Sequence, residues 1–370
     1  MNRLALGGAI DRRPERLAAL REALGRADLD GLLVSSLPNV RYLTGFTGSN
    51  ALLLVTPLEL MLFTDFRYAA QVEDEVGAHA TVQIEANSLW TGLWARLAAT
   101  TGVERIGFES AHLLHRDFSR LLEQGARWQW RPVVDCVEQL RECKDEGEVA
   151  CIERAVAIAE TALVRTFEQL RPGLTELAVA GLLEHQLRDA GSEGFPFETI
   201  VASGPRSALP HARASERVLA PGDFVLIDFG AIFAGYCADI TRTVVLGKAS
   251  ARQREIHDIV REANVRASGA IRAEMQGMAA DALAREYIDA RGYGDAFGHS
   301  LGHGIGLEVH EGPRLSRSAE APLAAGMVVT VEPGIYLPGW GGVRIEDDVL
   351  ITADGARVLT RLDRRLTELS

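Results

Sequence analysis

Single acidic residues inside near-continuous apolar strands are the feature that most limits how this chain can fold. Residues 224–230 read FVLIDFG, with Asp228 among apolar neighbours, and residues 236–245 read YCADITRTVV, with Asp239 in a similar setting. Burial of an isolated carboxylate is expensive, so each aspartate needs a partner. A tight turn centred on residues 233–234 would set the two carboxylates directly opposite each other on one face, about 5 Å apart. Because carboxylates that close repel each other, the pattern predicts a positive group between them.

The same arrangement occurs again further along the chain. Residues 327–332 read MVVTVE and residues 342–351 read GVRIEDDVLI, with a loop rich in glycine and proline between them. A hairpin centred on Gly339 would set Glu332 opposite Glu346. One such pair could be two edge-strand acids that face water, but a second pair of the same kind favours a shared function.

Three histidines lie between the two acidic pairs. Residues 298–313 read GHSLGHGIGLEVHEGP and contain His299, His303 and His310. The glycines allow backbone and substrate to approach closely, and histidine suits both metal binding and proton transfer. Four carboxylates would balance the charge of two divalent ions, and one neutral histidine would complete an oxygen-rich ligand set that suits manganese. Two such ions can stabilise a tetrahedral intermediate, so we expect a dinuclear hydrolase.

The chain is long enough for two domains. Its 370 residues are 47% hydrophobic and 24% charged, which is typical of a globular protein. The first part, residues 1–135, shows an α/β pattern. A helix is expected over residues 14–27, and strands are expected over residues 31–34, 51–55, 61–64, 81–84 and 105–108. The pattern changes over residues 134–145, where we place the domain boundary.

The second domain, residues 140–370, has a repeated order of elements. Helices are expected over residues 145–170 and from Thr175 to just before Gly191, followed by strands as far as Leu246. Helices return over residues 250–276 and on to Arg291, and extended segments follow from about Gly298. This order indicates an α+β fold with two pseudo-symmetric halves.

These residues match a known family. The chain resembles the pita-bread metallopeptidases, the group of methionine aminopeptidase, aminopeptidase P and prolidase. The matching segments are residues 228–230 (DFG), 238–243 (ADITRT), 302–311 (GHGIGLEVHE), 331–336 (VEPGIY) and 342–347 (GVRIED). Residues 39–45 (NVRYLTG) resemble the creatinase-like N-terminal domain of the proline-specific branch. The implied architecture is a smaller α/β domain followed by a catalytic pita-bread domain.

The resemblance implies a ligand role for five residues. Asp228 would bind one ion through both oxygens, and Asp239 and Glu346 would bridge the two ions. His303 and Glu332 would complete the ligand set of the second ion, and Glu332 would also transfer the proton of the attacking water. The implied cofactor is a pair of divalent ions, with manganese expected and cobalt, zinc or iron left open.

Other residues of the family pattern surround this ligand set. His310 and His211 would contact the peptide carbonyl and the oxyanion, and His299 would line the proline pocket. Tyr336 and Arg344 would support the ligands from behind. For His211 the alternative is an ordinary loop histidine, and for Arg344 it is a surface ion pair.

The expected function is an exopeptidase that removes an N-terminal residue preceding proline, of the aminopeptidase P type. The alternative is a prolidase restricted to Xaa-Pro dipeptides, which Arg314 would favour if it bound the dipeptide carboxylate. Peptides with proline at the second position are the implied substrates, and the resemblance implies a homodimer.

Two readings from other classes compete with this one. The segment GHSLG around Ser300 fits the nucleophile elbow of a serine hydrolase, but a glycine-rich run follows where that elbow needs a helix. The last histidine is His310, and no aspartate lies between it and Ser300. A pita-bread protein that binds peptides without cutting them would be expected to lack some of the ligands.

Charge and hydropathy exclude other partners. The net charge of −12 argues against nucleic acids and acidic membranes. The apolar run Leu4 to Ile10 is too short for a signal peptide, and no stretch is long enough to span a bilayer. With four cysteines outside any Cys-x-x-Cys pair, we expect reduced thiols and a cytoplasmic location.

Overall fold

The computed structural model describes residues 11–369 and divides into two compact units, Met1–Arg141 and Glu142–Ser370. The run from Leu4 to Ile10 lies outside the described residues. All four cysteines are free. No helix within residues 11–369 is long and apolar enough to cross a membrane.

The first unit is an α/β domain built on one six-stranded sheet. Its strands are β1 (Gly31–Val34), β2 (Ala51–Val55), β3 (Leu60–Asp65), β4 (Thr81–Glu85), β5 (Arg105–Glu109) and β6 (Gln129–Val133). The order is β4-β3-β2-β1-β5-β6, and only β2 runs antiparallel to its neighbours. The helices are α1 (Arg13–Arg26), α2 (Leu37–Thr44), α3 (Ala69–Val76), α4 (Leu89–Ala99), α5 (His115–Gln124) and α6 (Glu138–Glu142). The expected first helix and five strands are confirmed.

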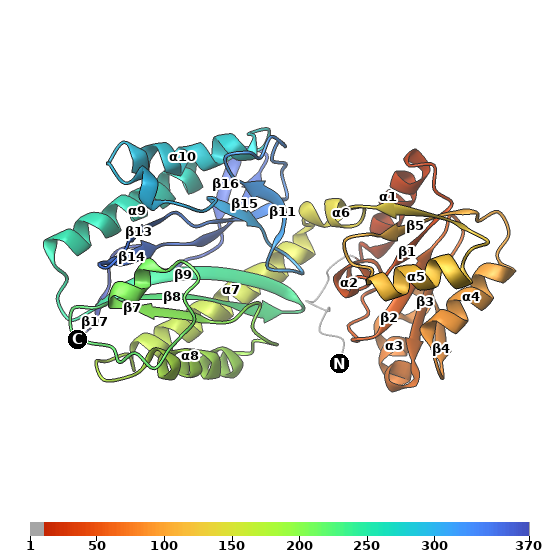
Figure 1. Ribbon diagram of the computed structural model, residues 1–370, viewed down its shortest axis with the longest axis horizontal. Helices are drawn as coiled ribbons and strands as arrows, with labels where there is room; N and C mark the ends of the chain where they lie inside the picture. The colour runs from red at the N-terminus through yellow and green to blue at the C-terminus, as the bar shows by residue number, and fades with distance from the viewer. Residues whose placement is uncertain (1–10, 370) are drawn as a thin grey trace. The chain divides into compact units, whose positions relative to one another are not determined.

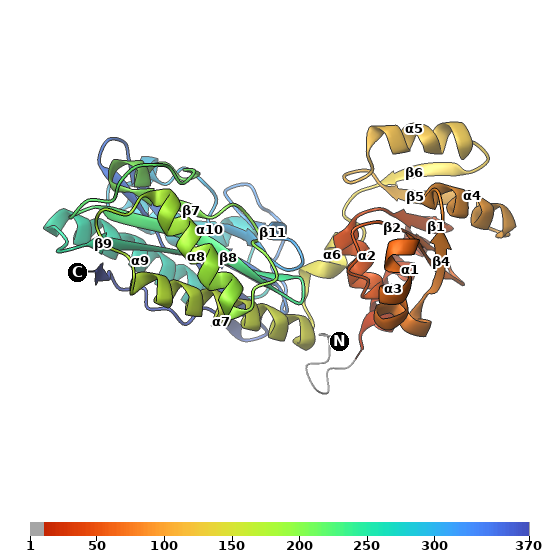
Figure 2. The ribbon, with the colours of Figure 1, turned by 90° about the horizontal axis from the view of Figure 1, so that it is seen from below.

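Helices cover this sheet because its four central strands, β1, β2, β3 and β5, are buried and largely apolar. Leu33, Leu54 and Phe63 pack with Leu93 of α4 and Leu121 of α5 in one buried cluster. In Figure 2, α1, α2 and α3 lie together, apart from α4 and α5.

The first half of the second unit begins with two capped helices. α7 (Glu146–Phe167) starts with a capping box formed by Asp145 and Glu148, which satisfies two free backbone donors. α8 (Glu176–Ala190) starts at Thr175, whose side chain accepts a hydrogen bond from the Ala178 amide, and ends at Gly191 with φ 104°. Both expected helices are therefore confirmed. The following sheet has the order β17-β9-β8-β7, with β7 (Ile200–Ser203), β8 (Phe224–Phe233), β9 (Tyr236–Leu246) and β17 (Glu368–Leu369).

The second half repeats this order with α9 (Ala251–Ala270) and α10 (Gly277–Asp289). The expected end of α9 at residue 276 is wrong, because Ile271 adopts an extended conformation and ends the helix. The next residues pair with another segment: the Glu274 amide donates to the Leu323 carbonyl, and Gln276 bridges to Pro322. Tertiary pairing thus overrides the local helix pattern.

The strands of the second half form two sheets. The larger has the order β11-β10-β12-β15-β16, and the smaller is the pair β13-β14. Their bounds are β10 (Gly302–Gly304), β11 (Glu311–Leu315), β12 (Val328–Val331), β13 (Gly334–Leu337), β14 (Gly341–Arg344), β15 (Asp347–Thr352) and β16 (Gly355–Val358).

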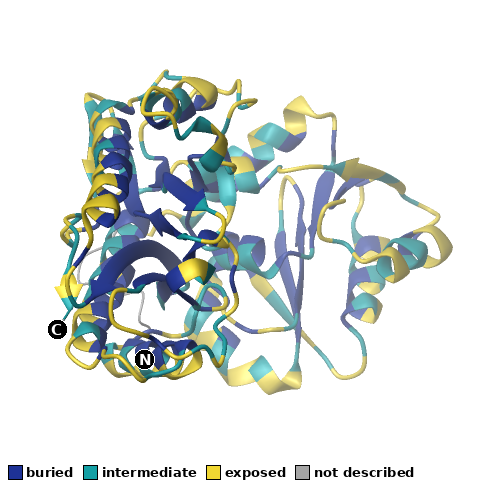
Figure 3. Cartoon of the chain, turned by 60° about the vertical axis from the view of Figure 1, so that its left-hand side comes forward, coloured by how far each residue is buried: buried dark blue, intermediate teal, exposed yellow. Residues whose placement is uncertain are grey.

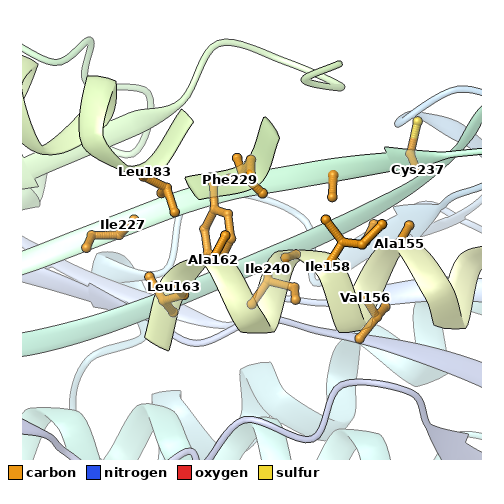
Figure 4. Packing of buried hydrophobic residues seen from close by; sticks show 14 of the residues in the cluster. Ala155, Val156, Ile158, Ala162, Leu163, Leu183, Ile227, Phe229, Cys237 and Ile240 are labelled. Atoms are coloured by element: carbon orange, nitrogen blue, oxygen red, sulfur yellow. The ribbon is translucent and has the colours of Figure 1, made fainter. Parts of the chain in front are cut away.

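The sheets of the second unit lie inside and its helices outside. Figure 1 shows α7 and α8 along one side of the strands and α9 and α10 along the other. In Figure 3 the strands are buried while the outer faces of the helices are exposed. Figure 4 shows Ile158 and Ala162 of α7 against Ile227 and Phe229 of β8 and Ile240 of β9. This packing is the expected α+β fold with two related halves, and it holds the strands that carry the acidic residues.

Candidate metal centre

Asp228 and Asp239 lie on the same hairpin, but not directly opposite each other. Gly230 pairs with Asp239, and Asp228 pairs with Thr241, so the two aspartates are diagonal neighbours. The predicted register is therefore wrong by two residues. The turn consists of Ala234 and Gly235, which both have positive φ (48° and 77°), as a type I′ hairpin turn requires. A shift of two residues keeps side-chain parity, so both carboxylates still point to one face.

The register predicted for the second pair is confirmed. Val331 pairs with Asp347 at the end of β12–β15, and Gly334 pairs with Arg344 at the start of β13–β14. Both ladders continue a hairpin centred on Gly339. Glu332 and Glu346 lie opposite each other in the short break between the two ladders.

The five predicted ligand residues line one cavity of about 410 Å³. Ligand atoms of Asp239, His303 and Glu346 lie within 4.8 Å of one another, an arrangement that could hold a metal ion. The His303 Nε2 atom lies 3.6 Å from Glu332 Oε1 and 3.8 Å from Asp239 Oδ2. Side chains from five separate segments of the chain therefore converge on one cavity.

The electrostatics of this cluster fit a bound cation. Burial, reinforced by the neighbouring carboxylates, raises the pKa of Asp239 and of Glu346 well above the usual range. Burial also raises the pKa of Glu332 to about 8 and lowers the pKa of His303 to about 4, so this imidazole is neutral. Buried oxygens of Asp228 and Asp239, both Oδ1, have no hydrogen-bond partner. Crowded acids, unpartnered oxygens and a neutral imidazole are the donor set that divalent ions bind.

Arg344 ties the aspartate pair to the rest of the cavity. Its guanidinium, buried in the protein, donates hydrogen bonds to Asp228 Oδ2, to the Tyr336 hydroxyl at 2.7 Å and to Thr241 Oγ1 at 3.1 Å. The Tyr336 hydroxyl lies 2.9 Å from His299 Nε2. Arg344 is therefore no surface ion pair: it orients Asp228 and, through Tyr336, is connected to His299.

The remaining predicted residues are distributed around the same cavity. His211, His299, His310 and Arg314 all contribute to its lining, whereas Tyr336 lies behind it. The His310 ring lies 4.4 Å from the His303 ring, and partial burial together with the Arg314 charge lowers its pKa. Arg314 pairs with His303 in the β10–β11 ladder, is exposed, and has no acidic partner within residues 11–369.

Several supporting residues were not predicted from the sequence. Thr241 donates a hydrogen bond of 2.7 Å to Glu346 Oε2, and its position two residues after Asp239 could have indicated that it faces the site. The Asn264 side-chain amide of α9 donates to the carbonyls of Val331 and Ile345, across the break between the ladders. Nothing in the sequence near Asn264 indicates this contact.

The nucleophile-elbow reading of Ser300 is not supported by the local fold. Ser300 lines the cavity, but strand β10 begins two residues later, where such an elbow needs a helix.

Comparisons with known proteins agree with this geometry. The model of metallopeptidase family M24 matches residues 150–353, and that of the creatinase/prolidase N-terminal domain matches residues 16–143. An Xaa-Pro dipeptidase of Pyrococcus horikoshii is 37% identical over 95% of this chain and 98% of its own. Among solved structures, an Xaa-Pro dipeptidase of Bacillus anthracis is 40% identical, covers 96% of this chain and 100% of its own, and has a TM-score of 0.93. An X-Pro aminopeptidase of Thermotoga maritima is also 40% identical, with 95% and 99% coverage and a TM-score of 0.87.

Proposed function

This chain belongs to metallopeptidase family M24, and from that premise we propose that it is an Xaa-Pro dipeptidase. As a family member it is a metal-dependent peptidase. The aminopeptidase P type, which the sequence favoured, has weaker support than the dipeptidase alternative, because more of the similar proteins are named dipeptidases or prolidases than aminopeptidases. The observation that carries the proposal is Arg314, which lines the cavity beside His303 and has no acidic partner in the part of the chain that the structure describes.

The metal ions would be held by five residues of the cavity: Asp228, Asp239, His303, Glu332 and Glu346. Their four carboxylates balance the charge of two divalent ions, and the oxygen-rich ligand set favours manganese. When bound, such ions polarise the scissile carbonyl and lower the pKa of water. The chain itself is proposed to act as a homodimer on substrates with proline at the second position.

Proton transfer is assigned to Glu332. A Glu332 carboxylate oxygen would accept the proton of the water that attacks the scissile carbonyl carbon. The same oxygen would deliver that proton to the proline nitrogen as the C–N bond breaks. Burial raises the pKa of Glu332 to about 8, and this tendency to hold a proton supports the assignment. His310 and His211 would donate hydrogen bonds to the carbonyl oxygen as it gains negative charge.

Substrate length would be decided by Arg314. In a dipeptide the C-terminal carboxylate belongs to the proline itself, one residue from the scissile bond. An unpaired guanidinium at the cavity wall could bind that carboxylate with charge-assisted hydrogen bonds. A tripeptide offers a neutral amide at this place and cannot make the same contact.

The test compares Arg314→Ala with wild type on Xaa-Pro and Xaa-Pro-Yaa peptides of the same first residue. We expect kcat/KM for the dipeptide to fall several-fold to a hundredfold, since such a contact contributes roughly 1–3 kcal/mol. Tripeptide hydrolysis should change much less. Arg317→Ala is the control, because Arg317 is exposed three residues further on and outside the cavity lining. Equal losses on both peptides, or a wild-type enzyme that prefers tripeptides, would contradict the dipeptidase proposal.

A further inference from the structure

The segment that carries His299 has no regular secondary structure of its own. Residues 297–301 lie between a short 3-10 helix (Gly294–Ala296) and β10, and they contain Gly298. Fixing such a segment in one conformation costs conformational entropy, which other contacts have to offset. Two side chains of α10 provide these contacts to its backbone.

Arg285 and Asp281 bond to this segment on both sides of His299. Arg285 Nη1 donates to the Phe297 carbonyl at 2.8 Å, and its Nη2 donates to the His299 carbonyl at 2.7 Å. The Asp281 Oδ1 atom accepts a hydrogen bond of 3.0 Å from the Leu301 amide. Three backbone groups within five residues are thus held from one helix.

The two side chains are also paired with each other. Arg285 Nε and Nη2 donate to the two Asp281 oxygens at 2.6 and 2.8 Å, and the guanidinium lies 4.2 Å from the centre of the Phe297 ring. Asp281 is only 1% exposed, and the Arg285 side chain is 13% exposed. Buried ion pairs contribute little net stability compared with apolar residues of the same size. This pair is better explained by the geometry that it imposes on the segment.

The first half contains a matching arrangement on its own second helix. Glu176 of α8 is fully buried, accepts hydrogen bonds from the Ser203 and Ser215 amides, and pairs with Arg206 at 3.0 Å. Arg206 Nη2 in turn donates to the Arg213 carbonyl at 2.6 Å. His211 lies in the loop between these contacts. In each half an acid–arginine pair therefore holds the backbone around a cavity histidine.

We propose that the Asp281–Arg285 pair is a positioning device for His299, and that it acts on substrate only through that histidine. The inference rests on the proposed function, an Xaa-Pro dipeptidase, together with the place in the proline pocket that the family resemblance implies for His299. The pair fixes the backbone of residues 297–301, while the Tyr336 hydroxyl and the Ser300 carbonyl hold the two ring nitrogens at 2.9 and 2.8 Å. Arg285 alone supplies the two parallel donors, because a lysine ammonium cannot span both carbonyls and the Asp281 carboxylate in this geometry.

A double-mutant cycle tests this proposal. Arg285→Lys should lower kcat/KM for an Xaa-Pro dipeptide by about 10- to 100-fold, mainly through KM, as expected for a displaced substrate contact. In the His299→Ala background the same change should cost less than about threefold, because the group through which it acts is absent. Metal content should remain that of wild type. Arg266→Lys is the matched control, since Arg266 forms an exposed i,i+4 pair with Glu262 on α9.

Hydrogen exchange gives a second measurement that does not depend on activity. Asp281→Asn and Arg285→Lys should both accelerate exchange in peptides that cover residues 297–301, while peptides from β8 and β9 keep their protection. If Arg285→Lys does not fold, Asp281→Asn, which keeps an acceptor for the Leu301 amide, carries the same cycle.

The outcomes separate this proposal from the proposed function. Full additivity of Arg285→Lys and His299→Ala, or unchanged exchange over residues 297–301, would overturn the positioning role alone. A His299→Ala variant with wild-type kinetics would also overturn the positioning role, because the pair would have no substrate contact to position. A wild-type enzyme that does not hydrolyse Xaa-Pro would instead overturn the proposed function.

Discussion

The two halves of the catalytic unit present their acids in different ways. In the first half, Asp228 and Asp239 lie within one continuous ladder of ten residue pairs, β8–β9. In the second half, Glu332 and Glu346 lie where the ladder is interrupted. The β8–β9 ladder fixes the backbone of the shorter aspartates, and Arg344 also orients the Asp228 side chain. The longer glutamates need additional contacts, and Asn264 supplies two of them.

The difference shows where the site is most easily disturbed. Asn264 Nδ2 donates to the carbonyl of the residue before each glutamate, Val331 at 2.9 Å and Ile345 at 3.3 Å. In a continuous ladder many backbone hydrogen bonds fix the position of each residue. Where the ladder is interrupted, the backbone position depends on hydrogen bonds from a few side chains. The second half should therefore tolerate remote substitutions less well than the first.

The largest expected effect treats both halves alike. Asp239→Asn and Glu346→Gln should each lower turnover by roughly 10²–10⁴-fold, because each removes a charge from the metal site. The chelated Glu346→Gln protein should melt at a higher temperature than chelated wild type, since one source of repulsion is gone. Turnover, metal content and calorimetry measure these effects. Near-wild-type rates for either variant would mean that the two halves do not share one site.

The cavity histidines should differ between the halves. His310→Ala should lower turnover by roughly 10²–10⁴-fold without loss of metal, because its ring contacts His303 and it lines the cavity, where it is proposed to bind the oxyanion. His211→Ala should cost less, since the His310 ring lies against His303, whereas the His211 ring makes no ring contact within residues 11–369. A His310→Ala protein that loses its metal would identify His310 as a ligand instead.

The two Asn264 hydrogen bonds across the ladder break, called the brace below, should raise the metal affinity of the site. Asn264→Leu keeps the side-chain size but removes both donors, and outer contacts of this kind are typically worth 10–100-fold in metal affinity. Ser268→Ala is the control, because Ser268 is buried one turn later on α9 and its hydroxyl has no partner. Metal titration of both variants distinguishes the brace from general packing. Equal affinities would remove the proposed difference between the halves.

The smallest effect concerns acid stability. Burial of His257 on α9 lowers its pKa to about 4, with Asp258, Arg261 and Arg242 as the nearby charges. In the unfolded chain His257 takes up a proton near pH 6.5, whereas in the folded chain it stays neutral until about pH 4. The free energy of unfolding therefore falls as the pH drops from about 6.5 towards 4. Between pH 7 and pH 5 this amounts to roughly 2 kcal/mol. His257→Gln should remove that part of the loss, as unfolding of the chelated protein at both pH values would show. An unchanged pH dependence would assign it to other groups.

Sequence reasoning worked best where local pattern decides the structure. The capped helices at Asp145 and Thr175 and the hairpin centred on Gly339 agree with the structure. The β8–β9 register was wrong because the turn requires positive φ at both central residues, a preference that places it on Ala234 and Gly235. The end of α9 was wrong because Gln276 pairs with distant Pro322.

The supporting contacts of the site could not be predicted from the sequence, because they too depend on tertiary structure. Acids in apolar strands are conspicuous, because their burial demands an explanation. Asn264, Asp281 and Arg285 lie on amphipathic helices, where polar residues are ordinary. Only tertiary structure shows that these three face inward and bond to backbone groups far away in sequence.

The two-residue turn at Ala234 and Gly235 also has a consequence for the order of assembly. A hairpin so tightly closed can form within about 1–10 μs, whereas the glutamate-bearing segments must wait for contacts across more than a hundred positions. During synthesis, Asp228 and Asp239 are therefore side by side well before Glu346 leaves the ribosome. The nascent chain has to carry two neighbouring acids without their later partners, and water screens the repulsion between them until burial is complete. Metal capture is then the closing event of maturation, and a shortage of metal should leave a folded, inactive enzyme rather than an unfolded chain.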